Sequence, residues 1–243
     1  MTNTSVGSGA PAPKSLAARF VGILVSPRDT FAAVAAHPRW LGMLALTVVL
    51  MAFFTALPLT TEDGRQAMID QQISTMKSFG MNVTPEVEAK MESRAASMPY
   101  TTGVSVLVFS PIVALIVAGL MFAIFNAALG GEASFKQVYS VIVHAGVLSA
   151  VAAAFAGIVN YIRGATGSVT TLASFLPMIP EQSFAGHLLG AIDVFMIWYV
   201  LVLAIGLAVL YRRRTQPIAT SLYGFYAVIA IVIAVVKSRA GGA

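Results

Sequence analysis

The sequence contains no cysteine and very little charge. Without cysteine there is no disulfide framework and no cysteine-bound metal or cluster. Charged residues make up 10% of the 243 residues, whereas a soluble domain normally carries about 25%. A surface with so little charge is not stable in water, so we expect lipid to be the solvent of this protein.

Motifs for catalysis and for metal binding are also lacking. The three histidines, His37, His144 and His187, are scattered and predict no metal cluster. The sequence has no glycine-rich phosphate loop, no Gly-x-Ser-x-Gly elbow and no recognisable nucleophile–base pair. We therefore expect no enzyme, no catalytic residue, no metal and no cofactor.

Basic residues exceed acidic ones, 15 against 10, for a formal net charge of +5. They lie mostly beside apolar segments, which favours contact with anionic lipid head groups over nucleic acid. Arg212, Arg213 and Arg214 form a dense cluster in a short polar segment. We expect this triplet to anchor the preceding apolar segment, with specific binding of lipid heads as the alternative.

Long apolar runs dominate the chain, which is 58% hydrophobic with a mean hydropathy of +0.83. A spanning helix needs about 20 mostly apolar residues, and irregular backbone facing lipid is not viable. The sequence therefore predicts an all-α polytopic bundle. Its five predicted spans are residues 40–59, 104–129, 138–162, 187–211 and 217–236, within a membrane domain at 40–236.

The segment before the first span is of a different kind. Residues 1–14, rich in Ser, Gly, Ala and Pro, are expected to be a disordered tail. Residues 15–39 are expected to form two short amphipathic helices, the second starting at Ser26 and Pro27. Two interpretations stay open: the pair lies in the membrane interface, or it packs on the membrane domain.

Residues 61–100 are predicted to form an extramembrane helical hairpin between the first and second spans. Helix starts are expected at Thr61 and at Thr84. Apolar faces rich in methionine run along both helices. Methionine fills irregular gaps and suits adaptable surfaces. The faces indicate either packing within the protein or on the bilayer, or a site for a protein partner.

The basic residues near the span ends indicate the orientation of the chain in the membrane. With a cytoplasmic amino terminus, eight basic residues lie inside: Lys14, Arg19, Arg28, Arg39, Lys136, Arg212, Arg213 and Arg214. Seven lie outside: Arg65, Lys77, Lys90, Arg94, Arg163, Lys237 and Arg239. The inner segments are shorter, so we expect the amino terminus inside and the carboxyl terminus outside.

Small residues recur every four positions in the third span, at Ala145, Ser149, Ala153 and Gly157. This spacing lets helix backbones approach closely. We therefore expect the third span to be the central packed helix, and a homo-oligomer is compatible with the same pattern.

Asp193 is the most informative polar residue, because it lies within the predicted fourth span. A carboxylate in the membrane is costly unless it is paired or protonated. Its expected partners are Asn160 and Arg163, at the end of the third span. Two interpretations stay open, a proton or ion site and a polar clamp between helices.

His144 is the second polar candidate in the membrane. It lies about two turns in from the opposite face, so we expect no direct hydrogen bond with Asp193. It is either a second station on a polar path or a histidine bonded to neighbouring groups.

Together these residues resemble the Yip1-domain membrane proteins in their bacterial form. The resemblance rests on the following residues: Ile23-Leu24-Val25-Ser26-Pro27, Phe31, Pro38-x-Trp40, Phe135, His144, Ala191-Ile192-Asp193, Trp198 and Ile205-Gly206-Leu207. It implies five spans and a cytoplasmic amino terminus, and it supplies no catalytic residue. Eukaryotic members resemble adaptors that engage small GTPases, a role that the short amino-terminal segment here does not indicate.

The expected function is therefore non-enzymatic. We expect a scaffold, an adaptor or a membrane-organising factor in the cytoplasmic membrane of a bacterium. The alternative is a small transporter or channel component that uses Asp193 with His144 and Asn160.

Overall fold

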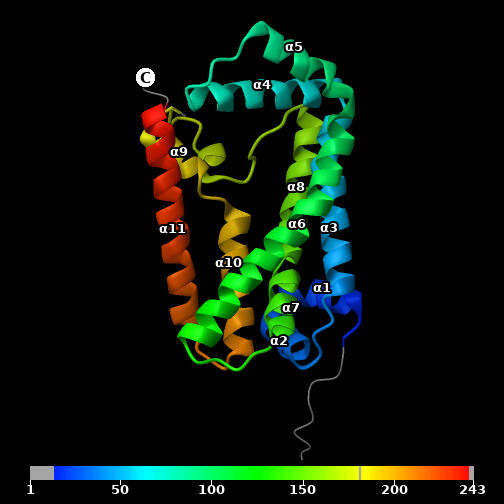
Figure 1. Ribbon diagram of the computed structural model, residues 1–243, viewed down its shortest axis with the longest axis vertical. Helices are drawn as coiled ribbons and strands as arrows, with labels where there is room; N and C mark the ends of the chain where they lie inside the picture. Colours follow the sequence, from blue (N-terminus) through cyan, green and yellow to red (C-terminus); the bar gives the residue numbers. More distant parts are fainter. Residues whose placement is uncertain (1–13, 181, 241–243) are drawn as a thin grey trace, which may run out of the picture.

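The computed structural model describes residues 14–180 and 182–240, which form an all-helical bundle (Figure 1). The tail predicted for residues 1–14 lies outside these residues, apart from Lys14. Within the described residues the backbone forms no β-strand, only one isolated bridge between Thr171 and Asp193. The prediction of an all-α protein is confirmed.

In the part of the chain that the structure describes, four stretches are long and apolar enough to cross a membrane, at residues 41–60, 95–128, 135–163 and 215–239. They contain α3 (Leu41–Ala56) with η1 (Leu57–Thr60), η2 (Ala95–Ser97) with α6 (Met98–Phe122) and a π-helical turn η3 (Ala123–Ala128), α7 (Phe135–Ala145) with α8 (Val147–Arg163), and α11 (Thr215–Ala240). They cover the first, second, third and fifth predicted spans.

The predicted fourth span is not one continuous helix. The prediction of a single helix over residues 187–211 was therefore wrong. Residues 184–190 form the short helix α9 (Phe184–Gly190), and α10 (Val194–Leu210) begins only after a non-helical step at residues 191–193. The reason is local, because Ser183 caps α9 and Asp193 caps α10. Of these two caps, Asp193 lies inside the predicted span, and a helix start at this position divides the span into two helices.

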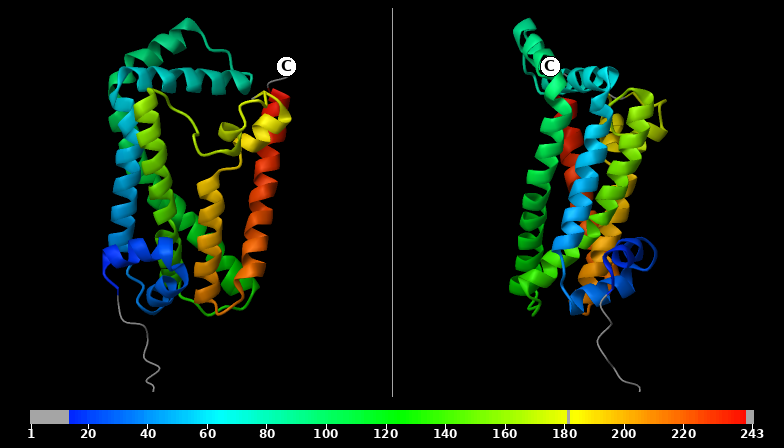
Figure 2. Two further views of the ribbon diagram at one scale, coloured as in Figure 1. Left: turned by 180° about the vertical axis from the view of Figure 1, so that it is seen from behind. Right: turned by 90° about the vertical axis from the view of Figure 1, so that its right-hand side faces the viewer.

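The long helices run lengthwise through the molecule with alternating direction (Figures 1 and 2). In chain order these are α3, α6, the α7–α8 pair, α10 and α11. The first and last described residues therefore lie at opposite ends of the bundle. We call the end that carries α1 (Leu16–Val25) and α2 (Pro27–Ala36) the amino-terminal end.

The core is centred on α7, α8 and α10. In the apolar 18-residue part of α7–α8, half of the residues are buried within the protein. Fully buried side chains include Val138, Val141, Leu148 and Leu207. By contrast, only 11% of the residues are buried in the corresponding 18-residue part of the apolar stretch that contains α6. The α6 helix therefore presents most of its surface to whatever surrounds the bundle.

The two amino-terminal helices pack on the bundle, as the second interpretation of residues 15–39 had it. Ile23, Phe31 and Val34 are fully buried. A Cβ added to Gly206 of α10 would lie 2.9 Å from Phe31 Cζ, so α2 and α10 approach closely. Their location at a membrane interface stays a prediction.

The hairpin segment contains α4 (Glu62–Ser78) and α5 (Pro85–Ser93), and α4 crosses the end opposite to α1 and α2 (Figure 1). The Thr61 hydroxyl accepts a hydrogen bond from the Gly64 N–H and so caps α4. Ile69 is buried, whereas Met76 and Met91 are half-buried. Packing within the protein thus covers part of the apolar face. The same end also holds α9 and the short helix η4 (Leu172–Phe175).

Candidate functional site

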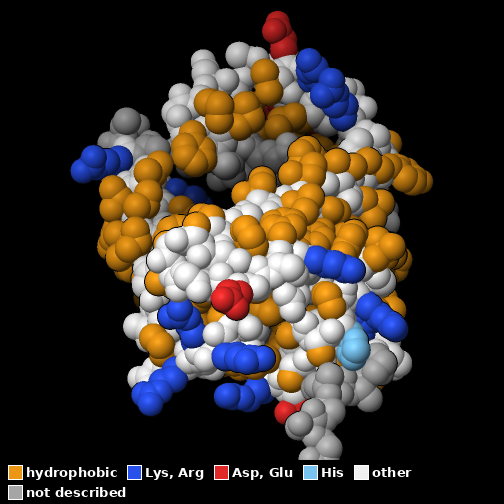
Figure 3. All heavy atoms as spheres, turned by 60° about the horizontal axis from the view of Figure 1, so that its bottom comes forward, with side chains coloured by type: hydrophobic (Ala, Val, Ile, Leu, Met, Phe, Trp, Pro, Cys, Tyr) orange, Lys and Arg blue, Asp and Glu red, His pale blue; other side chains and the backbone are white. Residues whose placement is uncertain are grey.

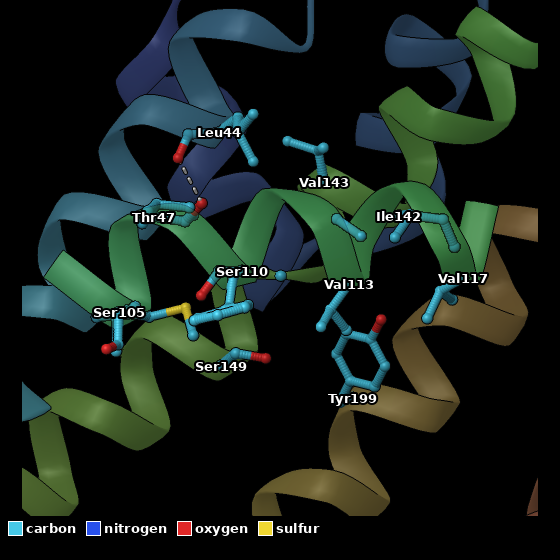
Figure 4. Close-up of a pocket in the computed structure, with 16 residues that line it drawn as sticks. Leu44, Thr47, Ser105, Ser110, Val113, Val117, Ile142, Val143, Ser149 and Tyr199 are labelled. Carbon is cyan, nitrogen blue, oxygen red and sulfur yellow. Dashed lines mark hydrogen bonds between the residues drawn. The ribbon is translucent and has the colours of Figure 1, made fainter. Parts of the chain in front are cut away.

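A hollow of about 400 Å³ opens in the middle of the bundle between α3, α6, α7–α8 and α10 (Figure 4). We call it the α3–α6 hollow. Its polar lining consists of hydroxyl groups from four helices: Thr47, Ser105, Ser110, Ser149 and Tyr199. The rest of the lining is apolar, and none of the described residues that form it is charged.

Small residues on one wall produce this space. Gly146 separates α7 from α8, and Ser149 follows one turn later, so little side-chain volume projects from this wall. On the opposite wall, Phe109 of α6 is 62% exposed beside the opening. The Thr47 hydroxyl donates to the carbonyl oxygens of Met43 and Leu44 at 2.9 and 3.1 Å. An apolar hollow with hydroxyls suits a membrane helix better than an ion.

Sequence reasoning did not find this hollow. Its hydroxyl residues lie on four different helices, and each looks like an ordinary small residue of a membrane helix. Only Ser149 had been singled out, as part of the small-residue row. The available signal was the recurrence of serine at Ser105 and Ser110 within an otherwise apolar segment.

Asp193 lies at the start of α10, not two turns inside a helix. Its carboxylate accepts hydrogen bonds from the Met196 N–H, at 3.0 Å, and from the Thr170 hydroxyl. Its own N–H donates to the Tyr226 hydroxyl oxygen at 2.9 Å. Tyr226 in turn donates to the Ala191 carbonyl oxygen at 2.9 Å. These bonds tie the α9–α10 step to α11 and to the segment before η4.

The expected pairing of Asp193 with Asn160 or Arg163 is wrong. The Asn160 amide donates instead to the Gly167 carbonyl oxygen at 3.0 Å, within the loop that follows α8. The Arg163 side chain is exposed at the end of α8. The reason is the broken fourth span, which places Asp193 beside Thr170 and Thr171, in the segment between α8 and η4.

His144 is fully buried and connects α7 to the amino-terminal helix α1. Its Nδ1 lies 2.7 Å from the Ser140 carbonyl oxygen, and its Nε2 lies 3.1 Å from Arg19 Nη1. A guanidinium only donates, so Nε2 must accept and Nδ1–H must donate. The contact therefore requires the neutral Nδ1–H tautomer. The residues that His144 contacts, Ser140 and Arg19, differ from those that bond the Asp193 carboxylate, Thr170 and Met196.

Arg19 is held between this histidine and the backbone. The same Nη1 donates to the Arg39 carbonyl oxygen at 2.6 Å. Burial and, secondarily, the charge of Arg39 lower the pKa of Arg19 from its ordinary value. The guanidinium nevertheless keeps its proton at any physiological pH. Arg19 thus joins α1, the residue before Trp40 and α7 at one point.

The small residues that recur in the third span, from Ala145 to Gly157, lie in two different environments. A Cβ added to Gly157 would clash with the Phe54 carbonyl oxygen, so α8 and α3 are in backbone contact there. Ala145 is fully buried and Ala153 is half-buried. Ser149, by contrast, lines the α3–α6 hollow. The row therefore serves a close helix contact at one end and a hollow at the other.

The arginine triplet forms the turn between α10 and α11. Arg212 adopts φ = 51°, a left-handed conformation that ends α10. The Arg213 guanidinium donates to the Leu129 carbonyl oxygen at 2.8 Å, next to η3. Arg213 and Arg214 are exposed at the amino-terminal end of the bundle. No cluster of three or more potential metal ligands occurs among the described residues.

The chain is similar in sequence to known membrane proteins. The chain matches the Yip1 domain over residues 21–236. It is also 21% identical to the membrane protein YknW of Bacillus subtilis (strain 168) over 243 residues, covering 99% of each chain. No solved structure matches it.

Proposed function

The chain belongs to the Yip1-domain family of membrane proteins, and from this premise we propose that it is a non-enzymatic scaffold that binds a helix of a partner membrane protein. The observation that carries the proposal is the α3–α6 hollow. It lies along the flank of α6, whose surface is largely uncovered within the bundle.

The chemistry of the hollow supports a helix as the occupant. Ser105, Ser110 and Ser149 offer hydroxyls, and serine and threonine bond across helices in lipid. Gly146 and Ser149 keep one wall flat enough for a second backbone to approach. Among the described residues, no carboxylate, histidine or basic group lines the hollow to bind an ion or to transfer a proton.

The transporter alternative has weaker support. Its three residues are engaged separately, since Asp193 bonds Thr170 and Met196, Asn160 bonds Gly167, and His144 bonds Ser140 and Arg19. Asp193 also acts as a helix cap, which is a structural use of a carboxylate. We therefore favour the scaffold.

Photo-crosslinking tests the proposal. A photoreactive amino acid replaces Phe109 at the opening of the hollow, and a matched variant carries it at Val232 on α11. Both side chains are exposed, at 62% and 54%. We expect a discrete crosslinked product from position 109 in native membranes and none from position 232. The mass of the product separates a second copy of this chain from a different protein.

Filling the hollow provides the second arm. Ser110→Leu and Ser149→Leu place bulk where the partner helix would lie, and both should remove the crosslink from position 109. Val232→Leu is the control and should leave the crosslink intact. Equal crosslinking at positions 109 and 232, or a product that survives both substitutions, would contradict the proposal.

We further propose that the protein is a multi-pass protein of the bacterial cytoplasmic membrane with α1, α2 and the arginine triplet facing the cytoplasm. The similarity to a bacterial membrane protein supports the location. The orientation is supported by the basic residues in the short segments of the amino-terminal end, the arginine triplet among them, because cytoplasmic segments carry an excess of Lys and Arg. Lys and Arg outnumber Asp and Glu on this face (Figure 3). The α4–α5 hairpin would then face outward, as a second surface for a protein partner.

A further inference from the structure

We propose that the amino-terminal end of the bundle holds one anionic phospholipid, with an acyl chain between α6–η3 and α11 and the phosphate on the arginines of the α10–α11 turn. The site is independent of the partner helix proposed above. It combines an apolar groove, called here the α6–α11 groove, with a basic cluster at one end of that groove.

The α6–α11 groove has a volume of about 400 Å³ and is lined mainly by apolar side chains. Met121 and Phe125 of α6–η3 form one wall, and Ile218, Leu222 and Phe225 of α11 form the other. Of the described residues that line it, Arg213 alone is charged. A ligand that fits must therefore be apolar along most of its length and anionic at one end.

Arg213 is fixed where the groove meets the basic cluster. One N–H donates to the Leu129 carbonyl oxygen at 2.8 Å, across from the α10–α11 turn. A guanidinium carries five N–H donors, so others remain for a phosphate. Planar guanidinium groups match phosphate oxygens in pairs. Arg213 also borders a second hollow, of about 570 Å³, together with Arg28, Arg212 and Arg214.

The groove wall on the η3 side is held in place by polar and aromatic contacts. The Phe125 ring stacks on Tyr211, with 4.8 Å between centroids. The Tyr211 hydroxyl donates to Asn126 Oδ1 at 2.6 Å, and the Asn126 amide donates to the Ala133 carbonyl oxygen at 2.7 Å. The segment η3 is itself a π-helical turn, and π-helical turns frequently occur at functional sites. These contacts fix the position of this wall of the groove.

Charge selects an anionic lipid over a zwitterionic one. Asp29 and Glu132 also border the hollows around the turn, so four arginines face two carboxylates and the local charge is positive. Figure 3 shows that Lys and Arg outnumber Asp and Glu on this face. Basic pockets between membrane helices at the cytoplasmic surface bind anionic head groups. The adjoining apolar groove favours a lipid over a soluble phosphate.

Lipid binding to the purified full chain tests the site. In a non-ionic detergent, the wild type receives phosphatidylglycerol, phosphatidylcholine with the same acyl chains, or glycerol 3-phosphate. Native mass spectrometry counts bound lipid and thermal unfolding measures stabilisation. We expect one phosphatidylglycerol to stay bound and to raise the unfolding temperature. The other two compounds should do neither at the same concentration.

Substitutions separate the two halves of the site. Arg213→Gln and Arg214→Gln should each weaken phosphatidylglycerol binding about fivefold, whereas Arg163→Gln at the other end of the bundle should not. Ser221→Phe puts a ring into the groove and should remove the bound lipid while all four arginines remain. Ala227→Phe, on an exposed part of α11 outside the groove, is its control.

Three outcomes would overturn the proposal. Equal retention of phosphatidylglycerol and phosphatidylcholine would indicate ordinary solvation by lipid. Stabilisation by glycerol 3-phosphate alone would indicate a soluble anion. Unchanged phosphatidylglycerol binding in both Arg213→Gln and Arg214→Gln would show that the arginines do not bind the head group. This comparison decides the question even if Ser221→Phe fails to fold.

Discussion

Asp193 closes the first turn of α10, and its carboxylate receives two donors, the Met196 N–H and the Thr170 hydroxyl. Because asparagine caps helices as well as aspartate does, Asp193→Asn should change the free energy of unfolding by less than about 0.5 kcal/mol. Asp193→Leu removes the cap and leaves the Thr170 hydroxyl without this acceptor, at a cost of about 1–3 kcal/mol. Thermal unfolding in detergent measures both.

The same pair of variants separates the cap from an ion site. If wild-type protein in liposomes carries protons or ions, and a well-folded Asp193→Asn does not, then the carboxylate must titrate during transport and the cap is not its main role. We expect no such flux.

The sequence directed attention to Asp193 but did not predict its position as the cap of α10. An aspartate after Gly190-Ala191-Ile192 is typical of a helix start, and that local signal was available. The long apolar run outweighed it, because length alone favours a continuous span. The partners Thr170 and Tyr226 lie 23 and 33 residues away in the chain, and no local pattern places them together.

His144 is the residue through which α7 holds α1. His144→Leu removes the acceptor of Arg19 Nη1 and the donor to the Ser140 carbonyl oxygen, while keeping an apolar side chain of similar size. The remaining buried polar atoms should cost about 1–3 kcal/mol. Amide exchange at residues 16–25 should become faster, because α1 loses one of its attachments.

His37→Leu is the control, since this half-buried histidine lies outside the core between α2 and α3. It should leave amide exchange in α1 unchanged. If His144→Leu also leaves it unchanged, the contact between Arg19 and His144 does not hold α1 in place.

At the scale of the elements, α3 and α8 touch through their backbones at Gly157. Any larger side chain there would clash with the Phe54 carbonyl oxygen, which belongs to the helix itself and cannot move aside. Gly157→Leu should therefore destabilise the bundle by about 1–3 kcal/mol or more through overpacking. Thermal unfolding in detergent provides the measurement.

Gly119 supplies a matched control, because it also lies in a membrane helix but has no atom within 4 Å of an added Cβ. Gly119→Leu should leave the unfolding temperature close to that of the wild type. Equal losses in the two variants would mean that glycine matters for the helices themselves and not for the contact between α3 and α8.

Helix location was predictable because apolar length and helix caps are local properties. Helices start directly after Ser26, Thr61 and Thr84, as their sequence pattern predicts, although of these three only the Thr61 side chain accepts a cap hydrogen bond. Interruptions within apolar runs were less predictable. The third span is two helices meeting at Gly146, and the fourth breaks at residues 191–193. Hydropathy averages over such steps, and the hollow beside Gly146 depends on where four separate helices come together.

At the scale of the whole molecule, α10 decides how many times the chain crosses the membrane. Its 17 residues correspond to about 25 Å at a rise of about 1.5 Å per residue, against a hydrocarbon core of about 30 Å. By length alone, α10 is therefore too short to cross the hydrocarbon core completely. Its direction, opposite to α11 and to α8 in the bundle, fits a full crossing (Figure 2).

Single cysteines resolve this question, because the natural chain contains none and each engineered thiol is the unique target of a maleimide. Gln72 on α4 and Gln216 at the start of α11 are both exposed. If α6, α7–α8 and α10 all cross, three crossings separate these positions and place them on opposite sides. We expect an impermeant maleimide to label Gln72→Cys in intact cells, and Gln216→Cys only after permeabilisation. The reverse pattern would invert the orientation but keep the five crossings. Labelling of both positions from the same side would mean that α10 does not cross, and the chain would then span the membrane four times.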